Sequence, residues 1–336
     1  MADKKGNPPG HLKHLVNLAL PETGGAILSV SDEFFAPAKR MLSADDPVFI
    51  AGRFDAHGKW MDGWESRRKR TAGHDSCVIR ICPGVIRAIE IDTSFFTGNY
   101  PPKAMLEACN ADVEPDENTT WTELVPGTGL EGDSRQLFTV SNENTWSFIR
   151  LNIYPDGGVA RLRVYGEPAA DTGSIERGQW EDLASCAAGG VALECNDMHF
   201  GDMSNLLSNQ PVANMGDGWE TRRRRQPGND WVILRLGQWG SVCRVEVDTA
   251  FFRGNYPARC SLRGGNPGAG SDLSAESANW VEILPQLALG PDQLHIFETQ
   301  VRDVGAVTHV RFDIFPDGGV ARLRLLGVPA ESGNMV

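Results

Sequence analysis

The chain has 336 residues, of which 41% are hydrophobic and 23% are charged, and its formal net charge is −12. These values are typical of a globular protein long enough to form two domains of ordinary size. The acidic balance argues against a nucleic acid or an anionic membrane as partner, and no apolar run approaches the ~20 residues that a membrane helix needs.

The amino terminus and the cysteines both favour a cytoplasmic protein. Residues 1–20 have no apolar stretch of the kind found in secretory signals, and we expect them to form a tail that is weakly helical from Leu12 to Leu20. The seven cysteines are odd in number and contain no C-x-x-C pair, which is unfavourable for a disulfide framework or a structural zinc site.

Short strands separated by turns are expected along the chain. In the first half, β-branched or alternating runs predict strands at residues 25–30, 77–81, 86–93, 104–108, 121–125, 136–140, 146–154 and 160–166. The acidic residues 110–120 are expected to form a surface loop, and residues 168–185 a polar linker with one short helical turn at 180–184. So many strands with so few helical stretches predict an all-β protein of the β-sandwich class.

The second half of the chain repeats the first. Nine residues, P-D-G-G-V-A-R-L-R, occur at 155–163 and again at 316–324. The block D-G-W-E-[ST]-R-R occurs at 62–68 and 217–223, D-T-x-F-F-x-G-N-Y-P occurs at 92–101 and 248–257, and a looser match joins 25–35 to 190–200. Because the blocks keep their order, we predict one duplicated domain, with repeats at 21–167 and 186–330.

Through these doubled blocks the chain resembles the allantoicase family, over roughly residues 15–328. The resemblance implies two tandem jelly-roll domains of the galactose-binding type. It also implies hydrolysis of allantoate to ureidoglycolate and urea in purine (allantoin) degradation, by an enzyme acting on C–N bonds of linear amidines. A further implication is a homo-oligomer, a hexamer, whose subunits together form the sites.

Two other interpretations stay open at this point. The chain could be a carbohydrate- or small-anion-binding jelly-roll module without catalysis, because a fold does not fix a function. Alternatively, one copy could be catalytic and the other structural. Sugar sites favour exposed aromatic platforms, whereas the repeated loops here are dominated by arginines with acidic partners.

Cleaving a C–N bond of allantoate requires a cation for the carboxylate, fixed groups for the two ureido arms, and a positioned acid and base. The repeated blocks supply each type. The candidate catalytic carboxylates are Glu65, Glu220, Asp62 and Asp217. The candidate substrate-binding residues are Arg67, Arg68, Arg222, Arg223, Asn99, Tyr100, Asn255, Tyr256, Arg161 and Arg322.

Several repeated residues also have a purely structural interpretation. Trp64 and Trp219 fit core anchors better than substrate platforms. The basic pairs at 69–70 and 224–225 fit a solvated face, and Arg161 alternates with apolar residues, as on an outward strand face held by salt bridges. The Asp-Gly-Gly segments fit turns.

No cofactor is expected. The sequence contains no D-x-D loop, no H-x-H and no H-E-x-x-H motif, which are common patterns of metal ligands. We therefore expect a metal-free acid–base mechanism, while a loosely bound divalent ion is left open.

Overall fold

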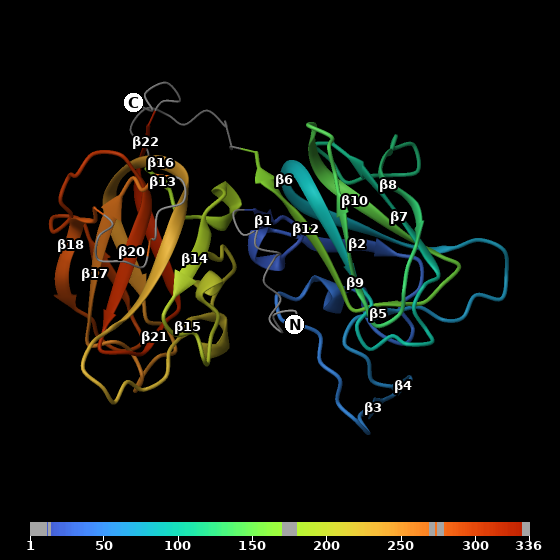
Figure 1. Ribbon diagram of the computed structural model, residues 1–336, viewed down its shortest axis with the longest axis horizontal. Helices are drawn as coiled ribbons and strands as arrows, with labels where there is room; N and C mark the ends of the chain where they lie inside the picture. The colour runs from blue at the N-terminus through green and yellow to red at the C-terminus, as the bar shows by residue number, and fades with distance from the viewer. Residues whose placement is uncertain (1–11, 13–14, 170–179, 269–272, 274–278, 331–336) are drawn as a thin grey trace. The chain divides into compact units, whose positions relative to one another are not determined.

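The computed structural model describes residues 12, 15–169, 180–268, 273 and 279–330, and it divides into two compact units, Met1–Ala169 and Ala170–Val336. In the described residues each unit consists of β-strands and short 3-10 turns, with no α-helix (Figure 1). The expected all-β architecture of two tandem jelly-roll sandwiches is confirmed. None of the described residues lies in a helix with the length and hydropathy that a membrane crossing would need.

The first unit contains one eight-stranded sheet that folds into a sandwich, with the order β1-β12-β6-β10-β7-β8 and with β2 and β9 also paired to β6. Two small sheets, β5 with β11 and β3 with β4, lie outside it. The strands are β1 Val16–Asn17, β2 Ala26–Val30, β3 Phe54–Asp55, β4 Gly58–Lys59, β5 Trp64–Glu65, β6 Asp75–Asp92, β7 Lys103–Cys109, β8 Thr122–Gly129, β9 Arg135–Thr139, β10 Thr145–Tyr154, β11 Gly158–Val159 and β12 Arg161–Pro168. The 3-10 turns are η2 Pro21–Thr23 and η3 Ala38–Leu42.

One long strand, β6, serves both layers of this sandwich. Its residues 75–80 pair with β10 and its residues 86–92 pair with β12, while Gly84 and Val85 pair with both. The sequence predicts two strands here, separated at Pro83 and Gly84. The chain continues instead, because Gly84 lies so close to β12 that a Cβ atom would be 2.5 Å from the carbonyl oxygen of Glu167. The Pro-Gly pair therefore lets the strand pass from one layer to the other without ending.

The second unit repeats this plan, with the order β13-β22-β16-β20-β17-β18 and with β14 and β19 also paired to β16. Its strands are β13 Glu181–Asp182, β14 Val191–Cys195, β15 Trp219–Glu220, β16 Asp230–Asp248, β17 Arg259–Gly265, β18 Val281–Ala288, β19 Leu294–Phe297, β20 Val307–Phe315, β21 Gly319–Val320 and β22 Arg322–Pro329. Its 3-10 turns are η4 Cys186–Ala188, η5 Met203–Leu207 and η6 Met215–Asp217.

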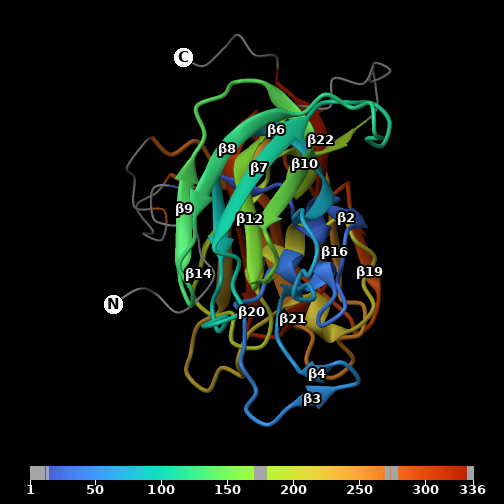
Figure 2. The same cartoon turned by 90° about the vertical axis from the view of Figure 1, so that its right-hand side faces the viewer.

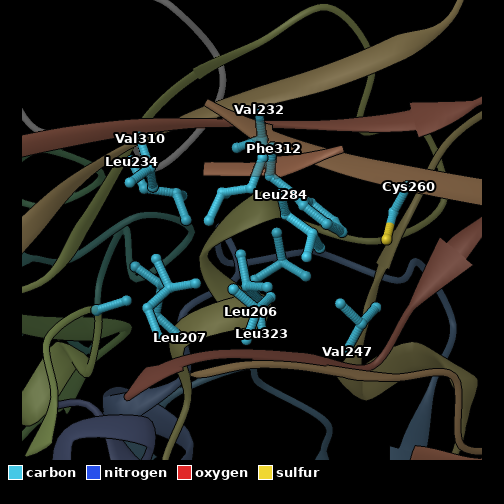
Figure 3. Packing of buried hydrophobic residues seen from close by; sticks show 14 of the residues in the cluster. Leu206, Leu207, Val232, Leu234, Val247, Cys260, Leu284, Val310, Phe312 and Leu323 are labelled. Carbon is cyan, nitrogen blue, oxygen red and sulfur yellow. The ribbon is translucent and has the colours of Figure 1, made fainter. Parts of the chain in front are cut away.

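The hydrophobic core of each unit lies between its two layers. Figure 3 shows Val232 and Phe312 of the second unit facing Val247 and Leu323 across this space, and all four are fully buried. Burying a side chain of this size contributes about 1.5–3 kcal/mol. All seven cysteines are free, so no disulfide holds the layers together.

Two segments expected to be helical contain edge strands instead. Strand β1, within 12–20, pairs with β12, and strand β13, within 180–184, pairs with β22. The apolar neighbours Leu18 and Leu183 are fully buried, so the apolar positions that resemble a helical stripe dock against a sheet. Of the expected tail, residues 1–11 and 13–14 lie outside the described residues, as do residues 170–179 of the expected linker.

The three repeated blocks meet at one end of each sandwich. Strand β5 of the first block pairs with β11 of the third, with Glu65 opposite Gly158. The second block joins them, because the Gly158 N–H donates to the carbonyl oxygen of Asn99 at 2.7 Å. In the second unit Glu220 lies opposite Gly319, whose N–H donates to the Asn255 carbonyl oxygen at 2.8 Å.

Close packing at this junction requires glycine. A Cβ atom on Gly158 would be 2.0 Å from the ring of Phe96, and one on Gly319 would be 2.0 Å from the ring of Phe252. Both phenylalanines are fully buried, so neither ring has room to move aside. The glycines thus permit the third block to lie directly on the second.

We expect Gly158→Ala to lower the free energy of unfolding by about 1–3 kcal/mol, the usual cost of forcing an extra carbon into a packed site. Gly98→Ala is the matched control, because a Cβ atom there meets nothing within 4 Å. Denaturant unfolding of both variants measures the difference, and equal midpoints would contradict the packing argument.

Candidate active site

Each site begins with a tryptophan that anchors the first block in the core. Trp64 and Trp219 are fully buried, and their indole N–H groups donate to the carbonyl oxygens of Asp32 at 2.8 Å and Asp197 at 2.9 Å. The interpretation of both residues as core anchors is confirmed. The following glutamate is thereby held at the edge of the sandwich.

Glu65 is half-buried and accepts a hydrogen bond from the side-chain amide of Asn99 at 2.7 Å. Glu220 accepts the same bond from Asn255 at 2.5 Å. The structure therefore brings together the candidate carboxylate of the first block and the candidate amide of the second, in both copies. We call these the glutamate–asparagine pairs.

Burial raises the pKa of Glu65 above its ordinary value, while the hydrogen bond from Asn99 and the positive charge of Lys59 oppose the rise. Burial acts in this direction because it disfavours the charged form of a carboxyl group. A titratable group with a raised pKa at a site where repeated motifs converge is the kind of residue that acts on protons.

The first arginine of each block is held by an aspartate from a distant loop. Asp32 accepts bonds from the backbone N–H of Arg67 at 2.8 Å and from its Nε at 2.7 Å, and Asp197 binds Arg222 in the same way. The Arg67 guanidinium also lies 5.1 Å from the centre of the Phe34 ring. Both arginine side chains stay largely exposed, so each guanidinium is oriented yet accessible.

The second arginines, Arg68 and Arg223, are exposed, and no carboxylate of the described residues forms an ion pair with either. An arginine in this state can bind an anionic ligand without first breaking a protein contact. Their neighbours differ: Lys69 pairs with Asp75 at 2.6 Å and Arg224 pairs with Asp230. The expectation of a solvated face for the basic pairs therefore fits only the exposed Arg70 and Arg225.

The candidates Asp62 and Arg161 are engaged with each other. The Arg161 side chain is 1% exposed, pairs with the Asp62 carboxylate at 2.7 Å, and donates from Nε to the Asp45 carbonyl oxygen at 2.8 Å. The salt-bridge interpretation of Arg161 thus describes its contacts, although its strand face is covered and not solvated. A direct role for either residue in chemistry stays a prediction.

In the second copy the equivalent residues are Asp217 and Arg322, and both lie at the same end of the sandwich. The Asp217 carboxylate caps turn η6 by accepting the backbone N–H of Asn214 at 3.0 Å. The buried Arg322 donates to the carbonyl oxygens of Asp217 at 2.5 Å and Gln210 at 2.8 Å. Their predicted catalytic and binding roles are likewise untested by these contacts.

The two candidate tyrosines are half-buried. The ring of Tyr100 packs against the cluster of Met61, Phe96 and Ala160. Within the described part of the chain, neither its hydroxyl nor that of Tyr256 makes a hydrogen bond, which leaves both phenols available to a ligand.

Sequence reasoning missed Asp32 and Asp197 as site residues. They belong to the loose match between 25–35 and 190–200, where an aspartate is one of the few residues shared by both copies. That shared aspartate is the signal that could have found them. The structure shows why it recurs, since one side chain fixes both the backbone and the guanidinium of the neighbouring arginine.

The fold and these contacts define a duplicated jelly-roll protein whose copies each hold a glutamate–asparagine pair beside oriented arginines. Comparison with known proteins agrees. The family model described as the allantoicase repeat matches residues 16–169 and again residues 181–330. The chain therefore belongs to the allantoicase family, a family of hydrolases.

Individual relatives support this assignment over nearly the whole chain. A probable allantoicase 2 of Burkholderia pseudomallei is 50% identical over 325 residues, which is 96% of this chain and 97% of the relative. A probable allantoicase of Pseudomonas aeruginosa is 51% identical over 321 residues, 94% of this chain and 97% of the relative. The crystal structure of allantoicase from Saccharomyces cerevisiae is 34% identical, with a TM-score of 0.79 and coverage of 94% of each chain.

We expect Asp32→Asn to lower the free energy of unfolding by about 1–2 kcal/mol at neutral pH, the scale of hydrogen bonds to a charged group. Although burial alone would raise it, the hydrogen bonds from Arg67 and Phe34 lower the pKa of Asp32. Because the pKa is lower in the folded state, the ionised carboxylate stabilises the protein at pH values above the unfolded pKa of ~3.9. This stabilisation is lost as the pH falls through the pKa of the folded state.

The difference between the wild type and Asp32→Asn should therefore shrink below about pH 4. Denaturant unfolding at several pH values measures it. The exposed Asp112, replaced by Asn, is the control, and a difference that persists unchanged in acid would refute the assignment.

Proposed function

We propose that the protein hydrolyses allantoate to ureidoglycolate and urea, and that the glutamate–asparagine pairs are the reacting centres. The observation that carries the proposal is the joining of Glu65 to Asn99, and of Glu220 to Asn255, from separate blocks that each occur twice. The family membership gives the substrate class, since the relatives bear the name allantoicase.

In this proposal the carboxylate of Glu65 removes a proton from water, whose oxygen then forms a bond to the central carbon of allantoate. The bond from that carbon to one ureido nitrogen breaks, and Glu65 returns the proton to the departing urea. Asn99 holds a ureido arm through its amide, and Arg67 and Arg68 bind the substrate carboxylate. Glu220, Asn255, Arg222 and Arg223 take the same roles in the second copy, and no metal participates.

Two further expectations accompany the proposal. The chain forms a homo-oligomer, a hexamer, and works in the cytoplasm on a small-molecule substrate.

Purified protein should release urea and ureidoglycolate from allantoate both with and without a chelator. Turnover that is lost with the chelator and restored by a divalent ion would keep the function and overturn the metal-free mechanism. Binding of allantoate without turnover would favour the small-anion-binding module.

We expect the double variant Glu65→Gln and Glu220→Gln to lose roughly 100- to 10,000-fold in kcat, the usual contribution of a general acid–base. Glutamine keeps the shape of the glutamate side chain and can still accept the hydrogen bond from the asparagine amide, but it cannot take up a proton. The exposed Glu123→Gln is the control. A double variant as active as the wild type would refute the site, and the single variants measure the share of each copy.

The pH profile should carry the signature of the raised pKa of Glu65. Because the ionised carboxylate is the active form, kcat/KM should fall as the pH decreases through a value above the ordinary ~4.3 of glutamate. Initial rates in the Glu220→Gln variant isolate the first copy. A rate that stays flat down to pH 4 would contradict the assignment of Glu65 as the base.

A further inference from the structure

The two copies differ most between the aspartate that holds the arginine and the buried tryptophan. Asp32 and Trp64 are 32 positions apart, whereas Asp197 and Trp219 are 22 positions apart, so the first copy has ten additional residues. They belong to the segment 45–60, which includes strands β3 and β4 and which we call the first-copy hairpin. It projects from the end of the first unit where β5 lies (Figures 1 and 2).

Ion pairs and backbone bonds fix the base of this hairpin. Arg161 donates to the carbonyl oxygen of Asp45 at 2.8 Å, and Asp46 pairs with Arg135 at 2.5 Å. The backbone N–H of Val48 donates to the Asp62 carboxylate at 3.0 Å. The Asp62–Arg161 pair therefore holds the base of the hairpin.

Aromatic contacts place the hairpin on both segments that flank the Glu65–Asn99 pair. The ring of His57 lies 4.5 Å from that of Phe34, which in turn supports Arg67. On the other side, Phe49 stacks on Phe95 at 5.9 Å, four residues before Asn99. A segment that contacts both flanks borders the site between them.

Lys59 is an exposed residue of this hairpin, at the end of strand β4. Its ammonium is 4.5 Å from the centre of the Phe49 ring, a cation–π distance, and no carboxylate of the described residues forms an ion pair with it. It is nonetheless near enough to Glu65 to affect the ionisation of that carboxyl group. In the second copy the amide has an uncharged neighbour, because Met215 Sδ lies 3.8 Å from Asn255 Nδ2.

We propose that Lys59 binds the carboxylate of the substrate in the first copy and thereby gives that site a higher affinity for the anion than the second. The inference rests on the proposed function. An anionic substrate beside the Glu65 carboxylate is repelled unless cations compensate, and in the first copy Lys59 adds a cation to those of Arg67 and Arg68. The ring of Phe49 holds the Lys59 ammonium in place. Unlike a carboxylate in an ion pair, the ring does not neutralise the positive charge.

The test uses the full-length Glu220→Gln variant, in which turnover comes from the first copy. There Lys59→Met should raise KM for allantoate at least tenfold while kcat changes less than about threefold, and Lys59→Arg should restore most of the affinity. Lys103→Met is the matched control, because that exposed lysine also lies over an aromatic ring, Tyr154, but on another strand. Its KM should equal that of the parent.

A neutral competitor separates charge recognition from a change of shape. Methylenediurea has the two ureido arms of allantoate without the carboxylate, so its inhibition constant should be the same with and without Lys59→Met. Three results would each overturn the role of Lys59. They are an unchanged KM for allantoate in Lys59→Met, an equal loss of affinity for the neutral compound, and an inactive Glu220→Gln parent. The proposed function fails separately, when the wild-type protein releases no urea from allantoate.

Discussion

The contact on which each site depends is the packing of a glycine against a buried phenylalanine ring, Gly158 on Phe96 and Gly319 on Phe252. It allows strand β11 to lie close enough for its backbone to bond both the tryptophan–glutamate strand and the asparagine loop. At this junction Glu65 lies within hydrogen-bond distance of Asn99. The three blocks are therefore repeated together because none of them forms a site alone.

Around this junction the copies share architecture and differ in electrostatics. Both place a buried tryptophan, an aspartate and an exposed arginine in the same way. The buried strand arginines bind backbone carbonyl oxygens in both copies, those of Asp45 and Asp62 for Arg161 and those of Gln210 and Asp217 for Arg322, and Arg161 also pairs with the Asp62 carboxylate. Breaking a buried pair leaves an uncompensated charge, so these arginines fix each loop in its own conformation.

Sequence reasoning found what is local or repeated. Period-two patterns gave most strands, and the doubled blocks identified the residues that converge. It failed where distant segments decide the outcome: β6 continues through Pro83–Gly84 because β12 packs on it, and the β1 segment is extended because β12 pairs with it. The face that carries Arg161 is covered by a segment 116 positions away, which no periodicity reveals.

An internal duplication works as a control within one molecule. A residue with the same contacts in both copies, such as Trp64 and Trp219, is explained by the shared fold and says little about specificity. Some residues have different surroundings in the two copies although the fold is the same. These residues indicate where the two sites differ chemically. Lys59, whose charge opposes the rise in the pKa of Glu65, and Met215, which lies beside Asn255, are such a difference, and it accompanies a glutamate–asparagine pair that both copies hold in common.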